Sequence, residues 1–187
     1  YLFNFVGYAC PDRVTSYVFE DFKRNMEINY YGQLVPILAL LPHFLREGRG
    51  HIVNCASVAG YLGMMGYAAY APTKFAVVGL TESLRNELAH RGVTFSLLFP
   101  PDTDTPGFKK ENESKPPELR IISEGGGLLT PEDVARTLID GVGRGRYFIL
   151  PGQARILWAI VRHFPRLSHW ILDRELAKAL KKTAPAP

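Results

Sequence analysis

The chain has 187 residues, of which 47% are hydrophobic, with two cysteines, five histidines and a net charge of +4. This size and composition predict one globular, largely ordered domain with a substantial core. The cysteines form no C-x-x-C motif and have no metal-ligand spacing to the histidines, so we expect a reducing compartment and no metal site. The opening residues lack a signal-peptide pattern, and no apolar run approaches the ~20 residues of a membrane-spanning helix.

Short apolar segments alternate with longer helical patterns over most of the chain. The predicted strands are 1–7, 50–57, 93–100 and 146–152, and the predicted helices are 20–46, 67–91 and one that starts at Thr130. Thr130 suits a helix N-cap, and Pro131 suits the first helical position. This alternation is typical of βα units around a parallel sheet whose strands are buried on both faces, and it predicts an α/β fold.

Two later segments depart from this pattern. Residues 102–129 are rich in charges, prolines and glycines, and we expect a functional loop or lid without regular structure. Residues 154–180 predict one or two amphipathic helices interrupted at Pro165. From Arg155 onward, seven Lys or Arg stand against two acidic residues. We therefore divide the chain into a sheet domain, 1–153, and a basic amphipathic tail, 154–187.

Tyr67, Tyr70 and Lys74 share one face of the second predicted helix, because their spacings of three, four and seven coincide on a helix. An ammonium near a phenol stabilises the phenolate and lowers its pKa, which makes a tyrosine usable as a general acid–base. Helical spacing alone leaves both tyrosines as candidates. Tyr70 stands one turn from Lys74 and Tyr67 two turns, so we favour Tyr70 and interpret Tyr67 as a wall of the substrate cleft.

Parallel strands bring their carboxyl ends to one edge of the sheet, where α/β proteins bind ligands. Asn4 and Gly7, Ser57, and residues 100–105 follow three of the predicted strands, so we expect them to meet at that edge. A serine hydroxyl there could hold a carbonyl against the Tyr70 phenol. These residues predict carbonyl reduction or alcohol oxidation with a hydride carried by a cofactor.

The segment "NCASVAGYLGMMGYAAYAPTKFAVVGLTESLRNEL" resembles the active-site region of short-chain dehydrogenases/reductases. That family places a serine thirteen residues before the tyrosine of a Y-x-x-x-K motif, as Ser57, Tyr70 and Lys74 are placed here. The resemblance implies a doubly wound, Rossmann-like fold with Tyr70 as acid–base and Ser57 polarising the carbonyl. It implies that Lys74 lowers the Tyr70 pKa and bonds the nicotinamide ribose. Asn29 matches the fourth catalytic residue of the family, which holds a water in a proton relay.

Two further motifs match cofactor-binding segments of this family. "NFVG" resembles N-x-A-G with Val6 replacing the alanine, and "PPDTDT" resembles P-G-x-x-x-T with Pro101 replacing the glycine. The implied cofactor is NADPH. By this resemblance the cofactor contacts are Asn4, Gly7, Tyr70, Lys74, Pro100, Thr103 and Thr105. The implied substrate contacts are Ser57, Tyr67 and Tyr70.

Within the family, "FPPDTDTPGFKKENESKPPE" is most similar to 3-ketodihydrosphingosine reductases, which use NADPH to reduce a long-chain keto amine at a membrane surface. The resemblance implies a lipid-like ketone substrate and a cytoplasmic protein, peripheral on the endoplasmic reticulum in a eukaryote. The tail over 154–180 would contact the membrane, since two tryptophans accompany its charge. The alternative is a soluble ketone, steroid or acyl-thioester substrate, with the tail as a lid, a dimer contact or a solvated face.

Other partners follow from the same comparison. The family commonly pairs its two long helices between subunits, so we expect a homo-oligomer. We expect no nucleic-acid binding, because no recognition module accompanies the basic tail.

No G-x-x-x-G-x-G turn, which receives the pyrophosphate in dinucleotide-binding folds, occurs in the sequence. The family comparison therefore predicts that the sequence is the C-terminal portion of the fold. We expect this piece alone to bind NADPH weakly, to be inactive and to expose an apolar sheet edge. A non-catalytic interaction protein built on the truncated fold is the alternative.

Overall fold

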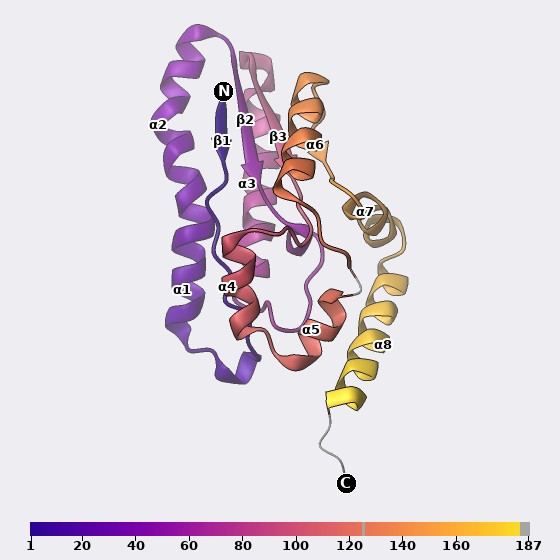
Figure 1. Cartoon of the computed structure of the whole chain (residues 1–187). Helices are drawn as coiled ribbons and strands as arrows, with labels where there is room; N and C mark the ends of the chain where they lie inside the picture. The colour runs from indigo at the N-terminus through magenta and orange to yellow at the C-terminus, as the bar shows by residue number, and fades with distance from the viewer. Residues whose placement is uncertain (125, 184–187) are drawn as a thin grey trace.

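The computed structural model describes residues 1–124 and 126–183, and its centre is a parallel sheet of four strands in the order β1-β2-β3-β4 (Figure 1). The register pairs Asn4 with Asn54 and Cys55 with Leu98, so the carboxyl ends of the first three strands meet at one edge. This confirms the predicted α/β fold and its parallel sheet, although the strands are shorter than predicted. They are β1 (Leu2–Asn4), β2 (Gly50–Cys55), β3 (Val93–Leu98) and β4 (Phe148–Ile149).

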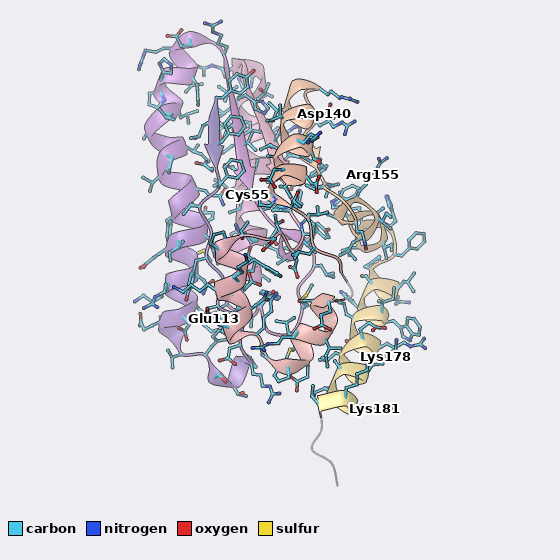
Figure 2. The ribbon with its side chains drawn as sticks, in the orientation of Figure 1. Cys55, Glu113, Asp140, Arg155, Lys178 and Lys181 are labelled. Carbon is cyan, nitrogen blue, oxygen red and sulfur yellow. The ribbon has the colours of Figure 1, made fainter. Side chains whose placement is uncertain are left out.

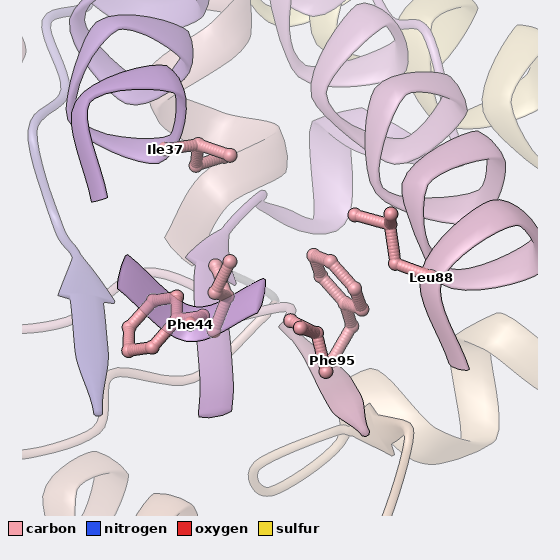
Figure 3. Packing of buried hydrophobic residues seen from close by; sticks show 6 residues of the cluster. Ile37, Phe44, Leu88 and Phe95 are labelled. Atoms are coloured by element: carbon pink, nitrogen blue, oxygen red, sulfur yellow. The ribbon is translucent and has the colours of Figure 1, made fainter. Parts of the chain in front are cut away.

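Two long helical regions cover one face of the sheet. The first runs through α1 (Phe19–Met26), a π-helical segment (Glu27–Tyr31) and α2 (Gly32–Glu47), and the second is α3 (Ala71–Leu88). The predicted helix over 20–46 is thus interrupted by a π-helical turn. The core between these helices and the sheet contains the residues shown in Figure 3, with four of them labelled: Ile37, Phe44, Leu88 and Phe95.

Helix α6 (Pro131–Gly143) covers the other face at β3 and β4, where Leu138 packs with Leu98 and Ile149. Thr130 caps this helix as predicted, since its Oγ1 accepts a hydrogen bond from the Asp133 backbone N–H at 3.1 Å. Gly141 permits close contact, because a Cβ there would lie 2.8 Å from the Ile149 side chain.

The edge strand β1 carries a row of stacked aromatic rings. The Phe3 centroid lies 6.2 Å from that of Tyr1 and 6.2 Å from that of Phe5, and all three side chains are exposed. These exposed rings accord with the expectation of an apolar sheet edge, which stays a prediction.

The segment predicted as an irregular loop, 102–129, contains two helices, so that prediction was wrong. These are α4 (Pro106–Ser114) and α5 (Pro117–Glu124). Thr105 starts α4 by accepting a hydrogen bond from the Phe108 backbone N–H at 3.1 Å, and Pro106 takes the first helical position. Both helices are short and polar on their outer sides, so their sequences show too few apolar residues at helical spacing to predict a helix.

The tail forms α7 (Ala154–His163) and α8 (Pro165–Thr183), and the predicted interruption at Pro165 is confirmed. Helix α8 lies along α5 (Figure 1), with Ser168 and Ala179 buried. The last four residues of the predicted tail, 184–187, lie outside the described residues. Within the described part of the chain, no helix combines the length and apolarity needed to cross a membrane. Short 3-10 turns complete the structure at Val14–Ser16, Val58–Gly60 and Ala89–Arg91.

Candidate active site

A cavity of about 1040 Å³ opens at the carboxyl edge of the sheet, between the strand ends and helices α4 to α8. Cys55, labelled in Figure 2, is the last residue of β2 and lines this cavity. Eight of the predicted site residues line it too: Gly7, Ser57, Tyr67, Tyr70, Lys74, Pro100, Thr103 and Thr105. The convergence expected at the strand ends therefore occurs, and Asn4 and Asn29 lie behind the cavity wall.

Tyr70 stands at the N-cap of α3, with Pro72 in the first turn of the helix as predicted. The ring of Tyr67 lies 5.7 Å from that of Tyr70, but its hydroxyl is already engaged: it donates to Glu111 Oε1 at 2.6 Å. Tyr67 is also buried, whereas Tyr70 is partly exposed toward the cavity. The geometry thus separates the two tyrosines and leaves Tyr70 as the phenol that can meet a substrate.

Lys74 is almost fully buried, and its Nζ lies 5.6 Å from the centroid of the Tyr70 ring. The ammonium donates to the Cys55 carbonyl oxygen at 3.0 Å, at the end of β2. Burial lowers the pKa of Lys74. The α3 helix and the β2 strand end together fix this cation beside the phenol.

The expected lowering of the Tyr70 pKa by Lys74 is not found. Burial raises the pKa of Tyr70 above its ordinary value of 10.0, the Ser57 side chain partly opposes this shift, and Cys55, Glu111 and Asp102 add to it. Burial is the main cause of the raised pKa, and the Lys74 ammonium donates to the Cys55 carbonyl oxygen instead of the phenol. A phenol with a raised pKa keeps its proton at neutral pH.

Ser57 caps the 3-10 turn Val58–Gly60 that follows β2. Its Oγ accepts a hydrogen bond from the Ala59 backbone N–H at 3.2 Å, which fixes the side chain at the cavity wall. The hydroxyl proton remains able to donate to a carbonyl oxygen in the cavity.

Asn29 lies in the π-helical segment and is fully buried. Its Oδ1 accepts from the Tyr8 backbone N–H at 2.7 Å, and its Nδ2 donates to the Tyr8 carbonyl oxygen at 2.9 Å. The side-chain oxygen and nitrogen of Asn29 thus both bind the backbone that follows Gly7. A π-helical turn is frequent at functional sites, and here it places this asparagine behind the cavity.

Asn4 was predicted to contact a cofactor, but its side chain turns into the protein. Its Nδ2 donates to Asn54 Oδ1 at 2.9 Å and to the Gln33 carbonyl oxygen at 3.3 Å. Asn4 is buried and does not line the cavity. The reason is the alternation of a strand, which directs this side chain away from the cavity and toward α2.

Sequence analysis missed a charged group at the cavity, in which Asp102 and Glu111 line the wall and Lys115 is buried behind them. Lys115 Nζ lies 3.2 Å from Glu111 Oε1 and 3.7 Å from Asp102 Oδ2, and also 4.3 Å from the Phe108 ring centroid. Glu111 and Lys115 have the i,i+4 spacing of a helical ion pair. Sequence analysis did not use this spacing, because residues 102–129 were expected to form an irregular loop.

Apolar side chains from the last helices complete the cavity and were also missed. Leu138 of α6, Leu157 and Ile160 of α7, and Leu172 of α8 line it. Helix α7 is tied to the site by Tyr61, whose hydroxyl donates to the Ala154 carbonyl oxygen at 3.0 Å. The tail is therefore part of the wall of the cavity.

The residues near Lys74 fit the nicotinamide and ribose half of a dinucleotide. A Cβ at Gly7 would lie 3.5 Å from Lys74 Nζ and 3.9 Å from Asn29 Oδ1, so the glycine keeps the space beside the ammonium open. A buried ammonium at the wall of a cavity suits hydroxyl ligands such as those of a ribose.

Comparison with known proteins identifies the class. Residues 1–116 match the model of the short chain dehydrogenase family, and the chain belongs to this family, as predicted. The chain is 41% identical over 150 residues to the 3-ketodihydrosphingosine reductase of Dictyostelium discoideum, covering 79% of this chain and 45% of that protein. The chain thus spans about half the length of the curated relatives it matches.

Solved structures agree on the fold. A short chain dehydrogenase from Burkholderia cenocepacia in complex with NADP superposes with a TM-score of 0.77 at 21% identity, over 91% of this chain and 67% of that chain. A short chain dehydrogenase/reductase from Burkholderia phymatum in complex with NAD has a TM-score of 0.74 at 27% identity, over 90% of this chain and 66% of that chain.

Proposed function

We propose that the protein is an NADPH-dependent reductase that converts a ketone to a secondary alcohol. The observation that carries this proposal is the placement of Tyr70, Ser57 and Lys74 in one cavity at the carboxyl edge of the sheet. Membership of the short chain dehydrogenase family supports it. The choice of NADPH over NADH follows the resemblance to NADPH-dependent reductases in this family.

A bound nicotinamide cofactor would supply the hydride to the carbonyl carbon. Tyr70 donates its phenolic proton to the carbonyl oxygen, which accords with a pKa raised by burial. Ser57 donates a hydrogen bond to the same oxygen and polarises the carbonyl. Lys74 and Gly7 hold the ribose side of the site, and Asn29 positions the chain after Gly7 through its two bonds to Tyr8. Pro100, Thr103 and Thr105 line the same cavity as Gly7.

The substrate we propose is a long-chain ketone such as 3-ketodihydrosphingosine. The similarity to the 3-ketodihydrosphingosine reductase of Dictyostelium discoideum supports this choice, and so does the apolar wall contributed by α6, α7 and α8. A chain of methylene groups is stabilised in such a cavity by ~0.8 kcal/mol per buried CH₂. A steroid, a soluble ketone or an acyl-thioester is the alternative substrate, and the assay below compares them.

We propose that α7 and α8 also contact a membrane surface, which would place the protein peripherally on the endoplasmic reticulum. Large apolar side chains are exposed here, among them Phe164 between the two helices and Leu167 and Trp170 of α8. Basic side chains accompany them, and Figure 2 shows Arg155, Lys178 and Lys181 on the outer side of the two helices. Apolar and cationic groups on one helix pair are the composition of an interfacial element.

We propose further that two copies of the protein pair through α2 and α3. Val35 and Leu38 of α2 and Phe75 of α3 are exposed on the side of these helices that faces away from the sheet. Analytical ultracentrifugation of the purified protein tests this proposal, and a monomer at micromolar concentration would reject it.

The enzymatic proposal is tested with protein expressed from its complete reading frame. NADPH and NADH oxidation are followed with a long-chain 2-amino-3-ketone, a ketosteroid, an acyl-thioester and a small soluble ketone. We expect NADPH-dependent turnover of the long-chain ketone and its loss in Tyr70→Phe, with cofactor affinity nearly unchanged because the ring and Lys74 remain. Lack of turnover on every ketone, or full activity of Tyr70→Phe, would reject the proposal.

A further inference from the structure

Asp102, in the loop before α4, and Glu111, on α4, line the same cavity as Tyr70. From this geometry we propose that Asp102 and Glu111, held by Lys115, form a subsite for a protonated amine on the carbon next to the reacting ketone. This inference rests on the proposed function, because it assigns residues that would recognise one part of the substrate.

The position of the two carboxylates is fixed from behind by a buried cation. The Lys115 side chain has no exposed surface, whereas the side chains of Asp102 and Glu111 are 33% and 18% exposed. Both acidic residues line the cavity and Lys115 does not. The lysine therefore holds the carboxylates, and the carboxylates face the ligand space.

The charges of this group do not balance. Two carboxylates face one ammonium, so this group of three side chains carries an excess negative charge. Lys74 also lines the cavity, but its ammonium donates to the Cys55 carbonyl oxygen at the end of β2. Lys110 also lines the cavity, but it is exposed to solvent, which screens its charge. A partly desolvated negative charge favours a cationic ligand over a neutral one of the same shape.

The contacts of Lys115 leave hydrogen-bonding capacity on the carboxylates. Its Nζ is buried and makes no hydrogen bond of good geometry within the described residues, so its attraction to the two acids is mainly that of charge. Lys115 and the Tyr67 hydroxyl both approach the same oxygen of Glu111, Oε1. A carboxylate has two oxygens and about four acceptor positions, so an ammonium with three donors finds partners here.

The subsite is adjacent to the reacting phenol. Tyr67 donates to Glu111 at 2.6 Å and its ring lies 5.7 Å from the Tyr70 ring, so it lies between Glu111 and the Tyr70 side chain. Asp102 and Glu111 both raise the pKa of Tyr70, as neighbouring negative charges do. A substrate ammonium beside them would offset this repulsion as Tyr70 loses its proton. A ketone without the amine would lack this compensation.

The test is a comparison of matched ligands. Calorimetry measures the binding of a long-chain 2-amino-1,3-diol and of the 1,3-diol of equal length without the amine, and kcat/KM is compared for the two corresponding 3-ketones. We expect the wild-type protein to favour each amine-bearing ligand by on the order of 10- to 100-fold, as for a charge-assisted hydrogen bond. Asp102→Asn and Glu111→Gln should each reduce this preference about 10-fold. Glu113→Gln is the matched control, since Glu113 lies exposed on α4 (Figure 2) and should leave the preference unchanged.

Equal binding of the two diols by the wild-type protein would overturn the inference, whether or not either variant folds. A preference for the amine that both variants retain in full would also overturn it. These outcomes differ from failure of the proposed function, which appears as lack of hydride transfer to both ketones. A protein that reduces both ketones equally well is a reductase without this subsite.

Discussion

The side-chain amide of Asn29 makes two hydrogen bonds to the backbone of Tyr8, one with each of its polar groups. The bonds join the π-helical segment to the chain that leaves β1 and carries Gly7 past Lys74. An asparagine in mid-helix is a poor helix former, and this contact gives it a structural reason to be there. The position of Gly7 beside the candidate ribose site thus depends on a side chain outside the cavity.

Substitution of Asn29 should therefore affect both stability and the site. Asn29→Ala leaves the partly buried Tyr8 N–H and carbonyl groups without their partners, which should lower the free energy of unfolding by about 1–2 kcal/mol. Urea denaturation measures this change, and Asn112→Ala on the partly exposed side of α4 is the control. An unchanged unfolding midpoint in Asn29→Ala would contradict the role assigned to these bonds.

The rate of ketone reduction should be insensitive to pH in the neutral range. Tyr70 must be protonated to donate, and burial raises its pKa above 10.0, so the rate should fall only at strongly alkaline pH. Asp102→Asn and Glu111→Gln each remove a negative charge that raises this pKa, so in these variants the fall should begin at lower pH. Profiles of kcat/KM against pH measure the effect. A fall centred between pH 6 and 8 in the wild-type protein would count against Tyr70 as the proton donor.

The sequence was sufficient for the parallel sheet and for the set around Tyr70, because strand periodicity and the spacing of Ser57, Tyr70 and Lys74 are local signals. It was insufficient for side-chain directions and partners that depend on tertiary contacts. The direction of the Asn4 side chain, the hydrogen bond from Tyr67 to Glu111 and the ion pair of Lys115 with Asp102 depend on segments far apart in the chain. The Tyr70 pKa was misjudged for the same reason, since helical spacing reveals the nearby ammonium but neither the burial nor the carboxylates.

Gly7 provides a test of the candidate cofactor site that does not depend on turnover. Gly7→Ala should be tolerated, because the new Cβ would be 3.5 Å from Lys74 Nζ, an ordinary contact distance. Gly7→Val would extend into the space beside the ammonium and should weaken NADPH binding at least about 10-fold, as expected for an overfilled site. Fluorescence titration with NADPH measures the affinity. Gly63→Val, at an exposed position with open space, is the control. Equal NADPH affinity in Gly7→Val and wild type would exclude this position from the site.

Glu118 joins three parts of the chain and should make stability depend on pH. Its Oε1 accepts from Arg13 Nη2 at 2.5 Å and from Thr183 Oγ1 at 3.1 Å, which links the N-terminal loop to α5 and α8. The hydrogen bond from Arg13 lowers the pKa of Glu118 below its ordinary value of 4.5. A lowered carboxyl pKa stabilises the folded state above the unfolded pKa, and this contribution is lost as the pH falls through the folded pKa.

Glu118→Gln should therefore lower the free energy of unfolding by about 1 kcal/mol at neutral pH, since Arg13 is partly exposed, and by less near pH 3. Thermal unfolding at the two pH values checks the difference, with the exposed Glu113→Gln as control. A loss of equal size at both pH values would show that charge is not the cause.

The exposed apolar residues of α8 should determine binding to membranes. Trp170 is 54% exposed and lies one turn from Arg174, whose guanidinium is 5.2 Å from the indole ring. An indole beside a cation suits the interface between head groups and acyl chains. Trp170→Glu should reduce flotation with vesicles that contain anionic lipid, while it leaves reduction of a short soluble ketone unchanged. Val14→Glu introduces the same charge at another exposed apolar position and should float as the wild type does. Binding that depends on anionic lipid but not on Trp170 would assign the contact to the basic residues alone, and flotation lost equally in both variants would reflect net charge.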